Sequence, residues 1–208
     1  MANATIVCIT MMPDLPSRSG DDLTATLREA RNEYERRTKT QSPPTLTQNL
    51  DVENFWAAEE ELLTQIPTHV EEHGHVEDKE LLENIVLWKF PVVIGNIREN
   101  TSTQIRTVTE RAFQAESARD AIQVLNGLQG VADSIAGAIL MFAYPHRYTV
   151  MDPLATNALA ALGYWSGETA AVAEQYESYC LRCHELSQQT GLSLRDVDRA
   201  LYILGGED

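Results

Sequence analysis

Residues 125–140 read LNGLQGVADSIAGAIL, and this stretch decides our interpretation of the chain. An apolar segment ends at a short turn that contains Gly127 and Gly130, and a second segment of small and apolar residues follows. Glycine adopts positive φ at little cost and allows close approach of the backbone. A helix that is apolar on all sides is normally buried. The pattern therefore predicts two helices joined by a tight hairpin, the second of which spans about Ser134 to Ala143.

A hairpin of this kind can bind the nucleic-acid backbone without reading its sequence. The amide groups at the N-terminus of the second helix face a phosphate, and glycine at the bend allows the close approach. We therefore predict that Gly130, Val131 and Ala132 contact DNA and that Arg147 adds a positive charge. Asp133 lies where the phosphate would approach, so its carboxylate either repels the phosphate or occupies the helix N-terminus instead.

A second motif, Tyr148-Thr149-Val150-Met151-Asp152, follows this helix after a loop. Together the two motifs resemble the helix-hairpin-helix (HhH-GPD) DNA glycosylase superfamily. Its members carry a leucine, a Gly-Val hairpin and a helix of small residues, followed by a hydrophobic pair and an aspartate at a helix start. The resemblance is close over residues 121–163 and loose from Leu81 to Leu204. The ending 194–201, with Trp88-Lys89 upstream, is similar to uncharacterised prokaryotic proteins that share this core.

The resemblance implies an all-α, glycosylase-like fold and a role in base excision repair of DNA. Asp152 falls on the position of the catalytic aspartate, and Ser134 falls where the strand-cutting members carry a nucleophilic lysine. Without that lysine, the resemblance implies a monofunctional glycosylase that forms no Schiff base and cuts no strand. A base flipped out of the helix is often stacked on aromatic rings, and Trp88 and Tyr148 are the candidates.

The chain departs from the family pattern in ways that concern DNA contact and base identity. Ala132 replaces the second hairpin glycine, and no acidic residue matches the second catalytic carboxylate of the adenine-mismatch branch. The four cysteines that hold an iron–sulfur cluster in some members are also absent, so we expect no cofactor.

Asp152 and Ser134 have structural explanations as well. An aspartate before Pro153 is a favoured helix N-cap, and a serine in the first turn is common. Two rival functions therefore stay open beside the enzyme. One is a catalytically silent module that binds nucleic acid or a protein on the same scaffold, and the other is an interaction protein that uses the acidic segment 51–83.

Charge is the main argument against a DNA partner. The net charge is −15, with 13 Arg and only 3 Lys, and duplex affinity depends largely on such cations. The charge is uneven, because segment 51–83 carries a net charge of −10 and segment 121–165 a net charge of −1. Acidic, lysine-poor surfaces also keep proteins soluble in salt-loaded cytoplasms.

The helical period recurs along the whole chain. We expect an N-terminal helical extension over residues 1–48, with Pro43-Pro44 in a linker, and one glycosylase-like helical domain over residues 49–208. Three cysteines and no recognisable leader suggest a cytoplasmic protein without disulfides. No apolar run is long enough for a membrane span. His69 and His73 stand one helical turn apart among acids, which we interpret as a solvated segment rather than a metal site.

Overall fold

The computed structural model describes residues 20–43, 52–76, 78–165 and 172–206. These residues form ten α-helices and one 3₁₀ helix and contain no strand, which confirms the all-α prediction. None of these helices is both long and apolar enough to cross a membrane. In chain order the helices are α1 (Gly20–Thr40), α2 (Phe55–His73), α3 (Lys79–Lys89), η1 (Pro91–Val93), α4 (Ile94–Ile97), α5 (Ser102–Phe113), α6 (Ala118–Leu125), α7 (Asp133–Ala143), α8 (Pro153–Ala161), α9 (Val172–Thr190) and α10 (Leu194–Leu204).

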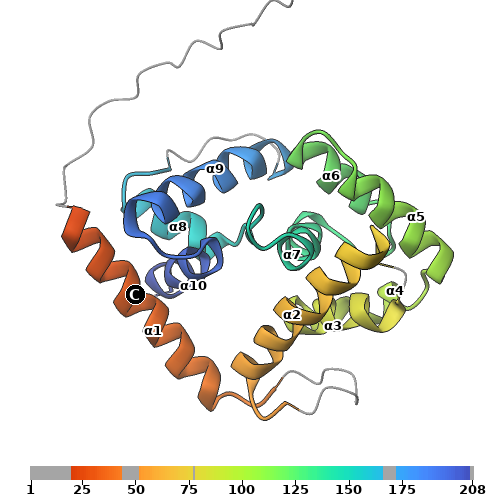
Figure 1. Ribbon diagram of the computed structural model, residues 1–208, viewed down its shortest axis with the longest axis horizontal. Helices are drawn as coiled ribbons and strands as arrows, with labels where there is room; N and C mark the ends of the chain where they lie inside the picture. The colour runs from red at the N-terminus through yellow and green to blue at the C-terminus, as the bar shows by residue number, and fades with distance from the viewer. Residues whose placement is uncertain (1–19, 44–51, 77, 166–171, 207–208) are drawn as a thin grey trace, which may run out of the picture.

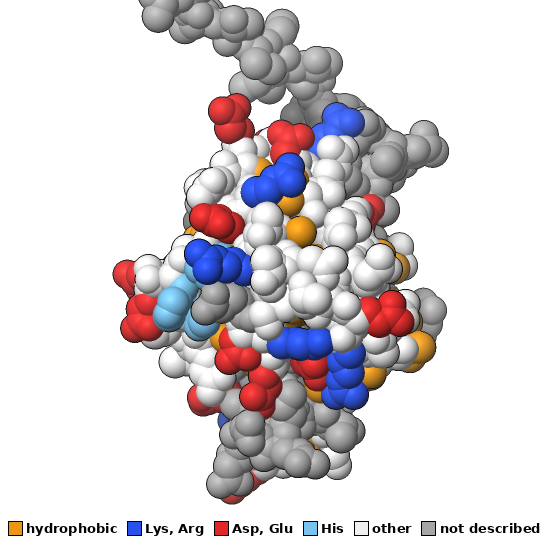
Figure 2. Space-filling model, turned by 90° about the vertical axis from the view of Figure 1, so that its right-hand side faces the viewer, with side chains coloured by type: hydrophobic (Ala, Val, Ile, Leu, Met, Phe, Trp, Pro, Cys, Tyr) orange, Lys and Arg blue, Asp and Glu red, His pale blue; other side chains and the backbone are white. Residues whose placement is uncertain are grey.

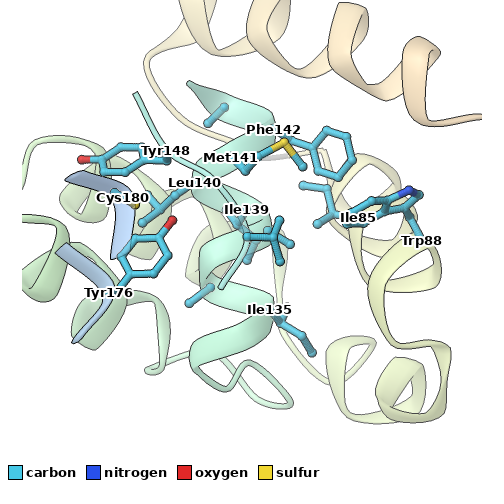
Figure 3. Close-up of a cluster of buried hydrophobic side chains, with 14 of the residues drawn as sticks. Ile85, Trp88, Ile135, Ile139, Leu140, Met141, Phe142, Tyr148, Tyr176 and Cys180 are labelled. Atoms are coloured by element: carbon cyan, nitrogen blue, oxygen red, sulfur yellow. The ribbon is translucent and has the colours of Figure 1, made fainter. Parts of the chain in front are cut away.

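Helix α7 lies at the centre of the hydrophobic core, with the other helices around it (Figure 1). Its residues from Ile135 to Ala143 are all buried, as its apolar sequence predicts. Figure 3 shows Phe142 on the side of α7 that faces Trp88 and shows Tyr176 on the opposite side. A Cβ atom added at Gly137 would lie 3.2 Å from the Tyr176 ring, so the small residue allows α9 to pack closely.

The predicted hairpin joins α6 to α7 and is fixed from behind by the segment that follows α4. The Asn100 side chain donates to the carbonyl oxygen of Gln129 at 3.0 Å and accepts from the amide of the same residue at 2.8 Å. Gly130 has φ +81°, the left-handed conformation that glycine adopts most readily. The tight glycine bend between two helices is therefore confirmed.

Replacing Gly130 by Ala is expected to destabilise the protein by about 2–3 kcal/mol. The new methyl group would adopt an unfavourable φ and would lie 2.9 Å from Cβ of Asn96. Gly191 is a matched control, since it has φ +69° but no atom within 4 Å of the added Cβ. Gly191→Ala is expected to cost only about 1 kcal/mol. Urea unfolding of both variants measures the difference, and equal losses would contradict the role of the Asn96 contact.

The N-terminal helix α1 packs along α10 and also contacts α2 (Figure 1). The side chain of Arg31 donates to Asp196 of α10 at 3.0 Å at the edge of this contact. The interior face of α1 is buried as the helical period predicts, and it consists of Leu23, Leu27, Ala30, Tyr34 and Thr38.

Pro67 lies inside α2, where the sequence predicts that a proline ends or kinks the helix, and the helix does not end there. The helix continues to His73 and ends at Gly74, which has φ +75°. A proline in a helix interior costs about 3 kcal/mol. Ile66 and Val70 are buried on either side of it, and this packing offsets the lost hydrogen bond.

The helical period in the sequence predicts helices that begin at Asp51 and at Glu168, and both positions lie outside the described residues. Helix α2 begins at Phe55, because the side chain of Asn54 accepts a hydrogen bond from the amide of Ala57 at 2.9 Å and caps the helix there.

Candidate active site

A cavity of about 420 Å³ lies between helices that are distant in the sequence. Its walls come from the C-terminal half of α1, the starts of α2 and α8, the end of α3, and α10. The volume falls in the range of small-molecule and cofactor sites. The side chains in its lining that matter for its chemistry are Tyr34, Phe55, Trp88, Lys89, Asp152 and Tyr202.

Asp152 lines this cavity and also caps α8. Its Oδ1 atom accepts a hydrogen bond from the amide of Leu154 at 3.0 Å, as the Asp-Pro start of the helix predicts. Its Oδ2 atom accepts a hydrogen bond from Nζ of Lys89 at 2.8 Å. Because both oxygens are held, the carboxylate has one defined orientation at the cavity wall.

Lys89 is the residue of this site that sequence reasoning missed. It occupies the last turn of α3, and its side chain is 15% exposed in the ion pair with Asp152. The resemblance directs attention to a lysine at position 134 only, and that position is a serine here. The pair Trp88-Lys89 stood out in the sequence, but nothing in its spacing indicated that it meets a residue 63 positions later.

The structure brings Trp88 to the cavity together with Asp152, but it places the other predicted side chains elsewhere. Ser134 is exposed at the start of α7 and is not among the described residues that line the cavity. Tyr148 is also outside this lining and is only 5% exposed. Its ring stacks near Tyr176 at a centroid distance of 6.3 Å, and the guanidinium of the exposed Arg147 lies 4.9 Å above it.

The hairpin residues lie apart from the described cavity lining as well. Val131 is buried, whereas Ala132 is exposed and forms the N-cap of α7 without a side-chain cap. The Asp133 carboxylate accepts a hydrogen bond from Nδ2 of Asn126 at 2.6 Å. The acid thus closes the hairpin onto the end of α6, and a negative charge stands at the helix N-terminus where a phosphate was expected.

A buried ionic cluster supports the wall of the cavity behind the aromatic rings. Glu59 of α2 is fully buried, and its carboxylate accepts hydrogen bonds from Nε of Arg195 at 2.9 Å and from Nε of Arg199 at 2.8 Å. The hydroxyl of Tyr34 donates to the same carboxylate at 2.6 Å. Burial alone would raise the pKa of Glu59, but the two guanidinium groups outweigh it and hold the pKa at about 2.

Asp198 of α10 is a second carboxylate in the cavity lining. It is paired with Arg195, and it also accepts a hydrogen bond from the amide of Val150 at 3.4 Å. Burial raises the pKa of Asp198 above its ordinary value, and the nearby charges of Arg195 and Lys89 offset only part of this effect. The cavity therefore holds two carboxyl groups in different environments, one capped and ion-paired at a helix start and one deeply buried.

Charged side chains of both signs lie on one outer side of the molecule. On the side of the molecule where Figure 1 places α4 and α5, basic and acidic side chains are interspersed (Figure 2). Phosphate binding by proteins relies largely on Lys and Arg. The described residues on this side therefore show no broad basic field of the kind that phosphate binding favours.

Comparison of the chain with protein-family models, with curated proteins and with solved structures finds no significant match. Similarity thus assigns the chain to no family. The interpretation of the site rests on its own geometry, in which an ion-paired carboxylate at a helix start faces an aromatic-walled cavity.

Proposed function

We propose that this protein is a monofunctional DNA N-glycosylase that removes a damaged or mismatched base after the base has been flipped out of the helix. One observation carries the proposal. The carboxylate of Asp152 lines a cavity with aromatic walls and is held by one hydrogen bond on each oxygen. The glycine hairpin immediately upstream supports the proposal, since such bends suit a sequence-independent contact with the DNA backbone.

The chemistry assigns a clear role to this carboxylate. When the N-glycosidic bond breaks, its electron pair leaves with the base nitrogen and positive charge builds at C1′ of the sugar. A carboxylate fixed beside C1′ stabilises that charge without having to reorganise. Water then adds its oxygen to C1′, and Asp152 accepts a proton from this water. The departing base anion takes up a proton from solvent and leaves in its neutral form, and Asp152 returns its own proton to solvent, so that the net reaction is hydrolysis.

The direct test is incubation of the full chain with oligonucleotides that each carry one damaged or mismatched base, followed by alkali. We expect release of at least one base and strand breakage only after alkali. Borohydride is expected to trap no covalent adduct, because the Lys89 amine is engaged as a donor to Asp152. An adduct that disappears in Lys89→Gln would replace the monofunctional proposal by a lysine-dependent one. If no base is released from a broad panel of oligonucleotides, at both low and molar salt, the proposal of glycosylase activity is wrong.

A catalytically silent nucleic-acid-binding module on the same scaffold is the second candidate, and one observation favours it. The ammonium of Lys89 lies 2.8 Å from Oδ2 of Asp152, and a cation at that distance offsets the attraction of the carboxylate for a positive sugar. Fluorescence anisotropy with the same oligonucleotides separates the two candidates. Binding without release would select the silent module.

Replacing Asp133 by Asn is expected to tighten DNA binding about 2- to 5-fold at low salt, because it removes a negative charge from the N-terminus of α7. The asparagine oxygen can still accept the hydrogen bond from Asn126, so the hairpin should stay closed. Anisotropy titrations over a range of salt concentrations measure the effect. Asp120→Asn is the matched control, since Asp120 is exposed at the other end of α6. Equal tightening in both variants would reflect net charge alone and would contradict a phosphate contact at the hairpin.

A further inference from the structure

Among the described residues, four aromatic side chains line the cavity: Tyr34, Phe55, Trp88 and Tyr202. A planar ligand can stack only on a ring whose face is not already covered by neighbouring side chains. Trp88 is only 8% exposed. The guanidinium of Arg195 lies 5.2 Å from the centre of its ring, and Phe142 meets the ring edge-on at 4.9 Å. Phe55 packs against it at 6.1 Å with a tilt of 34°. These neighbours already occupy the indole, so it has little surface left for a base.

Tyr34 is occupied in the same way. Its ring is 5% exposed and its hydroxyl donates to Glu59. The guanidinium groups of Arg195 and Arg199 each lie 5.9 Å from its ring centre. Tyr34 is therefore part of the ionic cluster that supports the wall, and it does not offer a free face.

Tyr202 differs from both of these rings. It is 44% exposed although it lines the cavity. Its ring lies perpendicular to that of Tyr34, with a centroid distance of 6.0 Å and an interplanar angle of 87°. A perpendicular contact leaves at least one face of the Tyr202 ring free of Tyr34, and α10 anchors the residue in the core through the buried neighbours Leu201 and Ile203.

The geometry points to Tyr202 as the platform on which a neutral, planar nucleobase stacks in this cavity. This inference rests on the proposed function, because the base is the group that the reaction releases. The assignment replaces the earlier expectation that Trp88 and Tyr148 stack the base, since Trp88 is covered on its faces and Tyr148 lies outside the described lining.

The charges of the cavity favour a neutral ligand over an anionic one. Lys89 is paired with Asp152 and Arg195 is paired with Glu59. Nε of Arg37 lies 2.6 Å from the carboxylate of Glu33. A phosphate would compete with these acids for their cations, whereas an uncharged aromatic ring leaves every pair intact. A volume of about 420 Å³ accommodates a nucleobase together with its sugar.

Ligand-observed NMR with free adenine, hypoxanthine and uracil tests the assignment without requiring catalysis. We expect the wild type to bind at least one base and Tyr202→Ala to bind it about 10-fold or more weakly, in line with the usual contribution of base–aromatic stacking. Tyr202→Phe should bind as the wild type does. Tyr202→Leu retains bulk but has no aromatic face, so it should lose binding, which separates stacking from simple cavity filling.

Tyr164→Ala is the matched control, since Tyr164 is partly exposed, bonds to Gln189 and is not in the described cavity lining. Thermal unfolding verifies that each variant is folded. Equal binding by wild type and Tyr202→Leu, or no binding of any base by the wild type, would overturn the inference. If base binding depends on Tyr202 but no base is released from oligonucleotides, the inference about Tyr202 stands and the proposed glycosylase activity is rejected.

Discussion

Asp152→Asn is expected to slow base release by roughly 100- to 1,000-fold under single-turnover conditions. The amide has no negative charge to set against the positive C1′ of the transition state, and it cannot accept a proton from the attacking water. The side-chain oxygen of asparagine can still accept the hydrogen bond from the amide of Leu154, which the wild-type Oδ1 accepts at 3.0 Å. The α8 cap and the fold should therefore persist, and the loss should lie in the chemical step.

Asp120→Asn is the appropriate comparison for this variant. It changes the net charge by the same amount, but Asp120 is exposed on α6 and is not in the described cavity lining. Release by Asp120→Asn should match that of the wild type, and thermal unfolding should show that Asp152→Asn is folded at the assay temperature despite the loss of its ion pair with Lys89. A rate for Asp152→Asn within a few-fold of the wild-type rate would remove Asp152 from the mechanism.

Glu59→Gln is expected to lower the free energy of unfolding by about 3–5 kcal/mol, because it removes a fully buried carboxylate that two buried guanidinium groups share. Arg195 and Arg199 both converge on this fully buried group. For a chain of 208 residues this loss corresponds to a fall in melting temperature of roughly 6 to 20 °C. Differential scanning calorimetry or urea unfolding measures it directly.

Glu60→Gln provides the control for this prediction in the adjacent residue. Glu60 also pairs with Arg199, but its side chain is 48% exposed. Exposed ion pairs contribute at most about 1 kcal/mol, so Glu60→Gln should be close to the wild type in stability. If both variants lost the same stability, burial would not be the reason for the importance of Glu59.

The stabilising effect of Glu59 should also depend on pH in a defined direction. The pKa of Glu59 is lowered in the folded protein to about 2, from an ordinary value of 4.5. A group with a depressed pKa stabilises the fold above its unfolded pKa and loses this effect as the pH falls through its folded pKa. The stability difference between wild type and Glu59→Gln should therefore be constant near neutral pH and should shrink between pH 4.5 and about pH 2.

Local patterns in the sequence were sufficient to predict much of the architecture. The glycine bend before α7, the Asp-Pro start of α8 and the buried face of α1 all depend on residues that are close together in the chain. Helix periodicity, capping preferences and the conformational freedom of glycine act over a few residues. Asp152 could be singled out for the same reason, because its helix start and the hairpin upstream lie within one continuous segment.

Local sequence patterns could not predict the ion-pair partner of Asp152 or the residues that line the cavity around it. Lys89 meets Asp152 across 63 positions, and Glu59 meets Arg195 across 136. In the sequence Glu59 was simply one of the acids of segment 51–83, whereas in the structure it is buried between two arginines. Tyr202 likewise reaches the cavity only because α10 packs along α1.

The amino-acid order was enough to establish where the helices lie, where they bend and which carboxylate starts α8, since these features follow from short-range steric and hydrogen-bonding rules. The packing of α1, α2, α3 and α10 around that carboxylate determined its partner Lys89, the lining of the cavity and the exposure of the Tyr202 ring. Such contacts depend on how whole helices pack their apolar faces against one another. The spacing of residues along the chain does not predict which helices pack together in this way.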